Sequence, residues 1–491
     1  MAGRRVMPLL LLAVAALLAA AAPAGASGRS SARYELIHRR GPSIAEQARE
    51  DRARAASISA RCRRRAAETS GAGRHSYSPA NPAADAAFAM PLSSGAYAGT
   101  GQYFVRFRVG TPAQPFLLVA DTGSDLTWVK CRRPSHANQA AATDSSSSSS
   151  YADSAPPHGR LFRPEKSRTW APIPCSSDTC RVSLPFSLAS CPTPHSACAY
   201  DYRYKDGSAA LGTVGTDSAT IALSGHAAAG SRKAKLRGVV LGCTTSYNGD
   251  SFLASDGVLS LGNSNISFAS RAAARFGGRF SYCLVDHLSP RNATSYLTFG
   301  PNPAVSSPSS SSKTACGSPA APRTRETPLL LDHRMRPFYA VTLNGISVDG
   351  QLLKIPRAVW DLERGGGAIV DSGTSLTVLA RPAYRAVVAA LSKKLAGVPR
   401  VAMDPFDYCY NWTSPSVPVP ELAVHFAGSA RLQPPAKSYV IDAAPGVKCI
   451  GLQEGEWPGV SVIGNILQQE HLWEFDLKNR RLRFIRSRCT Q

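Results

Sequence analysis

Short runs in which apolar and polar residues alternate, separated by Gly and Pro, are the dominant pattern along the chain. Residues 103–109 alternate in this way, and beyond a turn at Gly110 the apolar run 116–120 ends at an aspartate. We therefore expect a hairpin that leads directly to this aspartate. Further strands are predicted in residues 238–243, 295–300 and 338–348, which makes the chain mostly antiparallel β structure.

Two segments rich in Ser, Pro and Ala depart from this pattern. Residues 139–157 include six consecutive serines and are predicted to form a disordered surface loop, and residues 301–327 separate two β-rich regions. Residues 382–395 instead keep helical spacing, with Pro382 in the first turn and Gly397 beyond the end. A short helix on a β framework is expected there.

The sequences LVADTGSDLTW (118–128) and AIVDSGTSLTV (368–378) repeat each other 250 residues apart. Each places an aspartate, Asp121 or Asp371, after an apolar strand and just before a Gly turn. A single Asp-Thr-Gly commonly forms an ordinary turn, in which Asp accepts a backbone N–H and Gly supplies a positive φ. The shared flanks favour a duplicated lobe that brings two carboxylates together at its seam. A duplicated fold without chemistry is the alternative.

Two adjacent carboxylates can hydrolyse an amide without a metal, a cofactor or a nucleophilic side chain. Like charges about 3 Å apart cannot both ionise, so the pair shares one proton and can both activate a water and protonate a carbonyl oxygen. Gly123 and Gly373 let the backbone approach closely. The hydroxyls of Ser124 and Thr374 can hydrogen-bond the carboxylates and orient them.

From about Gly95 to Cys489 the chain resembles the pepsin-like aspartic proteases, and most closely their plant nepenthesin-type and chloroplast-nucleoid-type branch. The resemblance implies two related antiparallel β lobes with a catalytic cleft between them. It implies that Asp121 and Asp371 are catalytic, and that Thr122 and Ser372 form hydrogen bonds between the lobes below them.

The same resemblance assigns a flap that closes over substrate. Its tyrosine falls on Tyr204, followed by Gly207 and Ser208, and its supporting tryptophan falls on Trp128. A buried strand tyrosine and a core aromatic are the structural alternatives for these two residues. The departures from the family pattern are Ser260 and Lys205, each in place of a usual glycine, and the lack of two closely spaced cysteines after Cys131.

Twelve cysteines behind an apparent signal peptide predict disulfides in an oxidising compartment. Cys62 falls in the leader, and Cys316 lies in a Ser-rich tract and is expected to be a free thiol, which leaves ten cysteines for five bridges. The resemblance implies a Cys409–Cys449 pair. A Cys283–Cys489 pair follows if the cysteines of the insertion and Cys243 pair among themselves, although the connectivity within 131–243 stays open.

The closely spaced cysteines of the insertion could also suggest zinc. Cys175 and Cys180 are five residues apart, and Cys191 and Cys198 are seven apart. No His or Cys pair completes a tetrahedral set at the usual spacing, so we expect no metal and no other cofactor.

The N-terminus carries two segments that differ from the body of the chain. Residues 1–26 have the basic start, apolar run and small-residue site of a signal peptide, and residues 27–90 are rich in Ala and Arg and are assigned to a propeptide. A disordered basic leader without inhibitory role is the alternative. The remaining boundaries are an N-terminal lobe at 91–300 with an insertion at about 131–198, a linker at 301–335, and a C-terminal lobe at 336–491.

The formal charge of +23 invites an interpretation as a nucleic-acid binder. The first 88 residues carry 14 Arg against 6 acidic residues, so about +15 remains on the rest of the chain. No nucleic-acid-binding motif accompanies these cations, and we interpret them as solvated surface with affinity for polyanions such as acidic polysaccharide. Possible glycosylation acceptors on surface loops are Asn265, Asn292 and Asn411.

The preferred hypothesis is a secreted acid endopeptidase, made as a zymogen, that acts on polypeptides as a monomer without a membrane anchor. Vacuole and chloroplast are the alternative locations. A binding protein on the same fold, as in plant xylanase inhibitors, is a second hypothesis, and the presence of both aspartates and the flap tyrosine argues against it. DNA binding with secondary proteolysis is a third, which the signal peptide disfavours.

Overall fold

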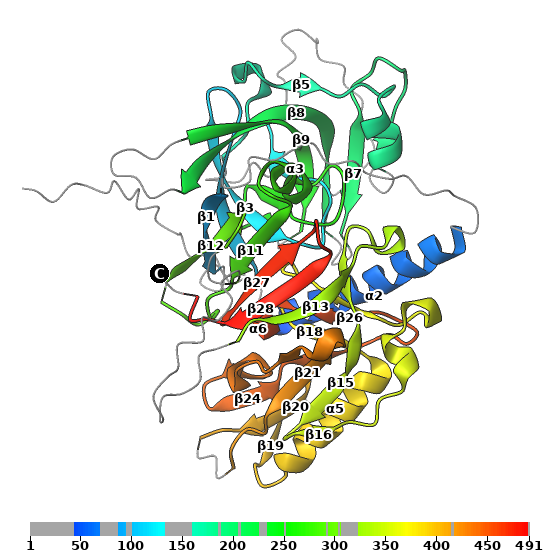
Figure 1. Cartoon of the computed structure of the whole chain (residues 1–491), viewed down its shortest axis with the longest axis vertical. Helices are drawn as coiled ribbons and strands as arrows, with labels where there is room; N and C mark the ends of the chain where they lie inside the picture. Colours follow the sequence, from blue (N-terminus) through cyan, green and yellow to red (C-terminus); the bar gives the residue numbers. More distant parts are fainter. Residues whose placement is uncertain are drawn as a thin grey trace, which may run out of the picture. The chain divides into compact units, whose positions relative to one another are not determined.

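Strands are the main regular element of the structure and form two related β lobes, which confirms the predicted bilobal, mostly β fold (Figure 1). The computed structural model describes residues 44–68, 87–94, 101–132, 160–184, 188–204, 208–224, 233–249, 252–290, 293–302, 305, 323–413 and 417–489. Outside these residues lie the predicted signal peptide at 1–26, the predicted loop at 139–157, Lys205, Gly207, Asn292 and Cys316.

The first lobe begins with the predicted hairpin of β2 (Tyr103–Val109) and β3 (Gln114–Asp121). Along β2 the apolar side chains are buried while Arg106 and Arg108 are exposed, as the alternating pattern predicts. The other elements of this lobe are β4 (Trp128–Lys130), β5 (Ala171–Pro172), β6 (Leu188–Ser190), β7 (Ala199–Arg203), β8 (Ala209–Ser224), β9 (Lys233–Asn248), β10 (Gly257–Ser260) and α3 (Phe268–Arg275).

The second lobe contains the predicted helix, α5 (Arg381–Lys394), with Pro382 in its first turn. Its buried face, which includes Tyr384, Val387 and Leu391, follows the helical spacing of the sequence. The other elements are β14 (Tyr339–Val341), β15 (Leu343–Val348), β16 (Gln351–Leu352), β17 (Ala368–Val370), β18 (Thr377–Ala380), β19 (Arg400–Met403), β20 (Phe406–Asn411), β21 (Leu422–Phe426), β22 (Arg431–Leu432), β23 (Val440–Ala444), β24 (Val447–Ile450), β25 (Leu452–Gly455), β26 (Ser461–Ile463) and α6 (Asn465–Gln468).

The repeated sequence motif corresponds to a repeated strand pairing. In the first lobe β3 pairs in parallel with β10, and Asp121 lies opposite Ser260. In the second lobe β17 pairs in parallel with β26, and Val370 lies opposite Ile463. Each aspartate is therefore held at the end of a short buried strand by a neighbouring parallel strand from much later in the chain.

A run of antiparallel strands joins the two halves of the sequence, in the order β1 (Ala87–Ser94), β12 (Thr294–Phe299), β11 (Arg279–Cys283), β27 (His471–Asp476), β28 (Arg481–Arg486) and β13 (Arg325–Leu330). Phe280 of β11 stacks on Phe475 of β27 with ring centroids 4.7 Å apart. The strand β13 lies inside the segment assigned to the linker, and β1 crosses the boundary assigned between the propeptide and the first lobe. The β framework thus extends beyond the lobe boundaries read from the sequence, because the strands that pair with β1 and β13 are distant in sequence.

The leader contains an element that the sequence analysis does not predict, the helix α2 (Ile44–Glu68). Its Ala and Arg residues are strong helix formers. Ala48, Ala55 and Ile58 are buried against apolar residues of the second lobe. Among the helices that the structure describes, none has the length and apolar character needed to cross a membrane.

Candidate active site

Asp121 and Asp371 are buried side by side where the two lobes meet. Asp121 is the last residue of β3, and Asp371 directly follows β17. A Cβ atom on Gly373 would lie 2.1 Å from Asp121 Oδ1, and one on Gly123 would lie 2.8 Å from Asp371 Oδ1. Glycine is required in both turns because the opposite carboxylate occupies the space of a side chain. The tertiary fold thus brings the two predicted carboxylates together.

The two turns hold their carboxylates in similar ways. Each carboxylate accepts a hydrogen bond from the glycine N–H two residues on, at 2.9 Å for Asp121 and 3.0 Å for Asp371. Thr374 Oγ1 donates to Asp371 Oδ2 at 2.6 Å, as the sequence predicts. Ser124 Oγ donates to the backbone carbonyl of Asp121 at 3.4 Å, and a hydrogen bond from the Ser124 side chain also lowers the pKa of the Asp121 carboxyl.

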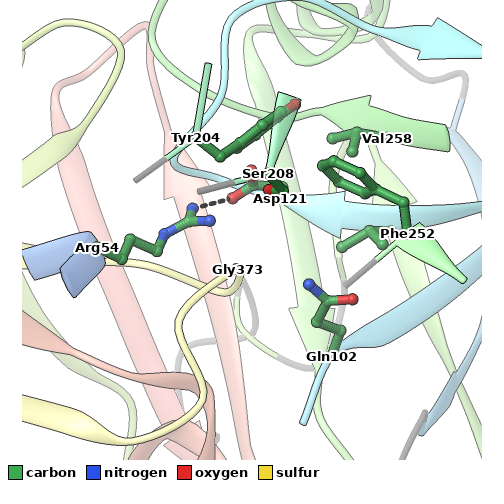
Figure 2. A pocket seen from close by; sticks show the side chains of 9 residues that line it. Arg54, Gln102, Asp121, Tyr204, Ser208, Phe252, Val258 and Gly373 are labelled. Atoms are coloured by element: carbon green, nitrogen blue, oxygen red, sulfur yellow. Dashed lines mark hydrogen bonds and ion pairs between the residues drawn. The ribbon is translucent and has the colours of Figure 1, made fainter. Parts of the chain in front are cut away.

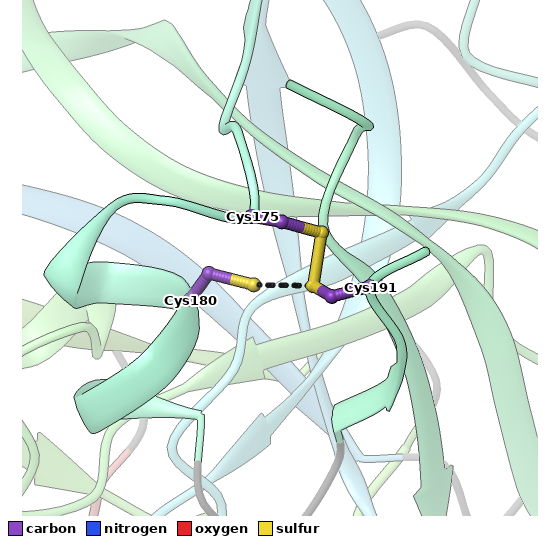
Figure 3. A group of neighbouring side chains, drawn as sticks. All are labelled: Cys175, Cys180 and Cys191. Atoms are coloured by element: carbon purple, nitrogen blue, oxygen red, sulfur yellow. Dashed lines mark hydrogen bonds between the residues drawn. A yellow bond between two sulfur atoms is a disulfide. The ribbon is translucent and has the colours of Figure 1, made fainter. Parts of the chain in front are cut away.

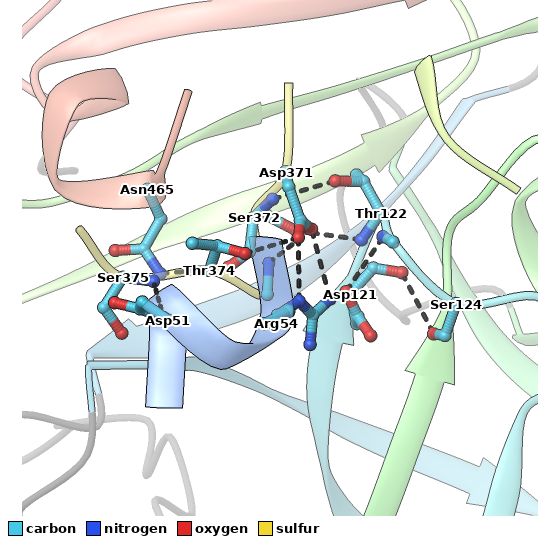
Figure 4. A network of polar contacts seen from close by, with 12 residues as sticks. Asp51, Arg54, Asp121, Thr122, Ser124, Asp371, Ser372, Thr374, Ser375 and Asn465 are labelled. Carbon is cyan, nitrogen blue, oxygen red and sulfur yellow. Dashed lines mark hydrogen bonds and ion pairs between the residues drawn. The ribbon is translucent and has the colours of Figure 1, made fainter. Parts of the chain in front are cut away.

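Thr122 and Ser372 exchange hydrogen bonds between the lobes, next to the aspartates (Figure 4). The Thr122 N–H donates to Ser372 Oγ at 3.1 Å, and the Ser372 N–H donates to Thr122 Oγ1 at 2.8 Å. Ser372 Oγ also donates to the Ala120 carbonyl at 2.9 Å. This reciprocal arrangement matches the role that the family resemblance implies, and it sets the spacing of the two turns.

Tyr204 Oη accepts a hydrogen bond from Trp128 Nε1 at 2.8 Å, the contact that the resemblance implies. Phe252 packs against both rings, with centroids 4.9 Å from Trp128 and 5.1 Å from Tyr204. The Tyr204 N–H donates to the Ser208 carbonyl at 2.8 Å, which closes the base of the predicted flap. The buried indole therefore holds the tyrosine beside the small cavity that Asp121 also lines (Figure 2).

Ser260, one of the departures from the family pattern, is fully buried and hydrogen-bonded. Its hydroxyl lies 2.8 Å from Thr127 Oγ1 and accepts the Phe268 N–H at 3.1 Å. At the equivalent position of the second lobe, a Cβ on Gly464 would lie 2.5 Å from the Leu376 carbonyl. The first lobe thus accommodates a side chain where the second lobe does not, because the Ser260 hydroxyl finds partners there.

Arg54 of α2 contacts both aspartates at once (Figure 4). Its Nη2 donates to Asp121 Oδ1 at 2.8 Å, and its Nε donates to Asp371 Oδ2 at 2.9 Å. The cavity that remains beside it is about 20 Å³, enough for a single water molecule. Tyr204, Phe252 and Gly373 line that cavity (Figure 2). With α2 in this position, the Arg54 guanidinium occupies the space beside both carboxylates.

Sequence reasoning did not single out Arg54 among the arginines of the leader. It assigned this segment to a propeptide without naming a residue that reaches the aspartates. A usable signal exists in the spacing of Ala48, Asp51, Ala55 and Ile58, which lie on one face of a helix and are buried. Arg54 borders this face and for that reason reaches the aspartates.

Polar contacts fix the position of α2 on the second lobe. The Asp51 carboxylate accepts the backbone N–H groups of Ser375 at 3.0 Å and Leu376 at 2.6 Å, directly after the second aspartate turn. Two turns along the helix, Ser59 Oγ accepts the Val460 N–H at 2.8 Å. These bonds satisfy backbone groups that would otherwise be buried without partners, so the helix docks in a defined register.

The electrostatics of the aspartate pair combine opposing effects. Burial raises the pKa of Asp121, the Arg54 guanidinium lowers it, and the neighbouring Asp371 raises it, with a raised pKa as the result. Burial also raises the pKa of Tyr204 well above its usual value, so its hydroxyl stays protonated. The site therefore favours at least one proton on the pair whenever the cation is absent.

The described part of the chain contains five disulfides: Cys131–Cys243, Cys175–Cys191, Cys180–Cys198, Cys283–Cys489 and Cys409–Cys449. The last two are the pairs that the sequence analysis expects. In the insertion, Cys180 Sγ lies 3.5 Å from Cys191 Sγ of the neighbouring bridge (Figure 3). Cys175, Cys180 and Cys191 lie close enough together to hold a metal ion. Each of them forms a disulfide, however, and so offers no thiolate to a metal.

Two of the predicted glycosylation acceptors lie on the described surface. Asn265 and Asn411 are both exposed, and Asn411 Oδ1 accepts hydrogen bonds from the backbone N–H and hydroxyl of Thr413. Their exposure is compatible with modification, which stays a prediction.

Comparison with known proteins places this fold and site in a family. The xylanase inhibitor N-terminal family matches residues 103–301, and the xylanase inhibitor C-terminal family matches residues 338–486. Aspartyl protease family protein 2 of Arabidopsis thaliana is 35% identical over 409 residues, which cover 82% of this chain and 74% of that protein. Aspartic proteinase nepenthesin-1 of Nepenthes gracilis is 29% identical over 409 residues, covering 81% and 80%.

Solved structures show the same fold at lower identity. Basic 7S globulin from soybean superposes with a TM-score of 0.57 at 19% identity, over 81% of this chain and 94% of that one. The fold and the paired aspartate turns define the class of pepsin-type aspartic proteases. The chain belongs to this family, in the branch that contains the nepenthesins and the xylanase-inhibitor-type domains.

Proposed function

We propose that the protein is an aspartic endopeptidase that acts at acidic pH and is made as an inactive precursor. The observation that carries this proposal is the arrangement of Asp121 and Asp371 in equivalent turns, within reach of one guanidinium. The substrates are polypeptides, and the enzyme acts as a secreted monomer. The intact pair, the reciprocal Thr122–Ser372 bonds and the Trp128–Tyr204 bond support catalysis over a purely structural use of the fold.

In the proposed reaction the pair shares one proton, and its apparent pKa values belong to both residues. The ionised carboxylate takes a proton from a water, whose oxygen attacks the amide carbon, while the protonated carboxyl gives its proton to the carbonyl oxygen. The tetrahedral diol then collapses. The first carboxyl protonates the leaving nitrogen, the second carboxylate recovers a proton from a diol hydroxyl, and the C–N bond breaks.

Arg54 accounts for the inactive precursor. Its guanidinium occupies the space between the lobes and pairs with both carboxylates, which replaces the shared proton by a fixed positive charge. A water cannot be activated while both carboxylates are held in this way. Activity therefore requires that α2 leave the site.

A binding or inhibitor protein on the same fold is the second candidate function. It is favoured by the match to the xylanase inhibitor families and by the shared fold with a seed globulin. On that hypothesis the aspartate pair would be left from a protease ancestor and would have no catalytic role. The complete set of hydrogen bonds around the pair favours the enzyme.

A peptide-cleavage assay of the acid-treated protein, between about pH 3 and about pH 7, tests the proposal. We expect cleavage that peaks in acid and is blocked by a statine-type inhibitor, whose hydroxyl replaces the attacking water. A metal chelator serves as the control and should have no effect. Absence of any cleavage from protein shown to have lost α2 would leave the binding-protein hypothesis in its place.

A further inference from the structure

A group of four exposed cations lies on the first lobe, where α3 packs beside the start of β9. We call it the basic ridge, and its members are Lys235, Arg237, Arg271 and Arg275. Arg271 Nε and Nη2 donate to the Arg237 backbone carbonyl at 3.0 and 2.7 Å. Arg275 Nη1 donates to the Lys235 backbone carbonyl at 2.8 Å. These carbonyls hold the guanidiniums of Arg271 and Arg275 in place. Because a carbonyl is neutral, the positive charge of the ridge is not reduced.

The described residues provide no ion pair for any member of the ridge. Several exposed cations of the second lobe are paired, since Arg381 contacts Glu454, Lys394 contacts Asp349 and Lys448 contacts Asp442. These three cations are matched to nearby carboxylates. The ridge instead brings like charges together, and Arg271 and Arg275 lie one helical turn apart on α3. Like charges at this spacing destabilise a helix, so packing of the fold does not explain them.

The described elements around the ridge supply it with no ion pair. Asp217 of β8 is buried and accepts hydrogen bonds from Ser167 and Thr169. Lys235 Nζ donates to Thr111 Oγ1 at 3.2 Å, and Thr220 of β8 lies opposite Lys235 in the sheet. Beyond α3, the backbone N–H of Lys478 donates to the Gly278 carbonyl at 3.3 Å, which adds another exposed cation. The nearby carboxylate of Asp476 is buried and already paired with Arg279.

We propose that the basic ridge binds the carboxylates of an acidic polysaccharide. This binding would be independent of the proposed proteolysis. Fixed guanidiniums suit bidentate contact with carboxylates, and a row of cations suits a polymer with a charge on each unit. Nucleic acid is the less favoured polyanion for two reasons. Five disulfides indicate an oxidising compartment outside the cytosol, and the ridge itself carries no aromatic side chain on which a base could stack.

The test compares three proteins in the full, disulfide-bonded form. They are the wild type, a ridge variant (Lys235→Gln, Arg237→Gln, Arg271→Gln and Arg275→Gln), and a matched control that loses four exposed cations elsewhere (Arg325→Gln, Lys354→Gln, Arg357→Gln and Lys393→Gln). Binding to polygalacturonate, to its methyl-esterified form and to duplex DNA is measured at about 0.05 M and about 0.2 M salt. Circular dichroism and melting temperature check that each variant is folded.

We expect the wild type and the control to bind polygalacturonate and the ridge variant to bind it roughly tenfold or more weakly at low salt. Binding should fall with added salt and with esterification, because both remove the charge attraction. Equal loss in the ridge variant and the control would show that net charge alone is responsible and would overturn the proposal. Tighter binding to DNA than to polygalacturonate would assign the ridge to another partner, and undiminished binding by a folded ridge variant would also refute it.

Discussion

Arg54 Nε lies 2.9 Å from Asp371 Oδ2, although 317 residues separate the two in sequence. The same guanidinium reaches Asp121 through Nη2, so one side chain of the leader contacts both halves of the duplicated site. The contact joins helix α2 to the residue that directly follows strand β17. The same contact therefore links the proposed peptide hydrolysis by the aspartate pair to its proposed inhibition by α2.

Asp121→Asn and Asp371→Asn should each abolish proteolysis while the fold is kept. Either change removes the shared proton but preserves the size of the side chain, so we expect a loss of at least ~10²–10⁴-fold, the usual contribution of general acid–base catalysis. Cleavage rate and circular dichroism are measured on the same samples. Substantial activity in either folded variant would contradict the proposed mechanism.

Arg54→Gln should weaken the inhibition of the precursor. The variant loses the cation that contacts both carboxylates but retains the Asp51 and Ser59 anchors. We expect the uncleaved variant to process itself, or to cleave peptide, at a higher pH than wild type does. Arg52→Gln is the matched control, because Arg52 donates to Gln453 Oε1 at 2.6 Å and does not contact the aspartates. Identical behaviour of the two variants would show that Arg54 has no special role.

Acid should release α2 from the site. Protonation of a carboxylate weakens its ion pair with Arg54, and these ion pairs to Asp121 and Asp371 help to hold α2 in the site. Falling pH therefore favours the open form, and rising pH favours the closed one. Incubation of the purified precursor at about pH 4 and about pH 7, followed by sequencing of the new N-terminus, measures this directly. A precursor that is fully active with its leader attached would exclude the zymogen hypothesis but not the protease assignment.

The same pKa has a consequence for overall stability. The folded pKa of Asp121 is raised above its usual value, so its protonation stabilises the fold at pH below that usual value, and this contribution is lost as pH rises through the folded pKa. Asp121→Asn removes the ionisation. We expect its melting temperature near pH 7 to equal or exceed that of wild type, and a clearly lower value would contradict the raised pKa.

Trp128→Phe should slow cleavage without abolishing it. The change removes the Nε1 donor to Tyr204 Oη but keeps an aromatic ring against Phe252. A hydrogen bond of this kind contributes about 0.5–1.5 kcal/mol of net stabilisation, which sets the scale of the expected loss in kcat/KM. Tyr204→Phe removes the other partner of the same bond, and the double variant should lose little more than either single one. Fully additive losses in kcat/KM would indicate that the bond does not couple the two residues.

The sequence by itself determined the features that depend on local pattern. Alternation predicted the β2–β3 hairpin, helical spacing predicted α5, and the repeated Asp-Thr/Ser-Gly motif predicted two carboxylates in equivalent turns. These features could be predicted because periodicity and turn chemistry act over a few residues. The reciprocal hydrogen bonds of Thr122 and Ser372 could be predicted only from the family resemblance, because no pattern within either segment indicates that the two residues meet.

The tertiary structure alone decided which residues meet across long stretches of chain. It selected Arg54 from the arginines of the leader, because burial of Ala48, Ala55 and Ile58 and the bonds of Asp51 orient α2. It also showed that Ser260 is accommodated, since Thr127 and the Phe268 N–H satisfy its hydroxyl. Such contacts depend on docking surfaces assembled from distant segments, and a linear pattern does not encode which surfaces will face each other.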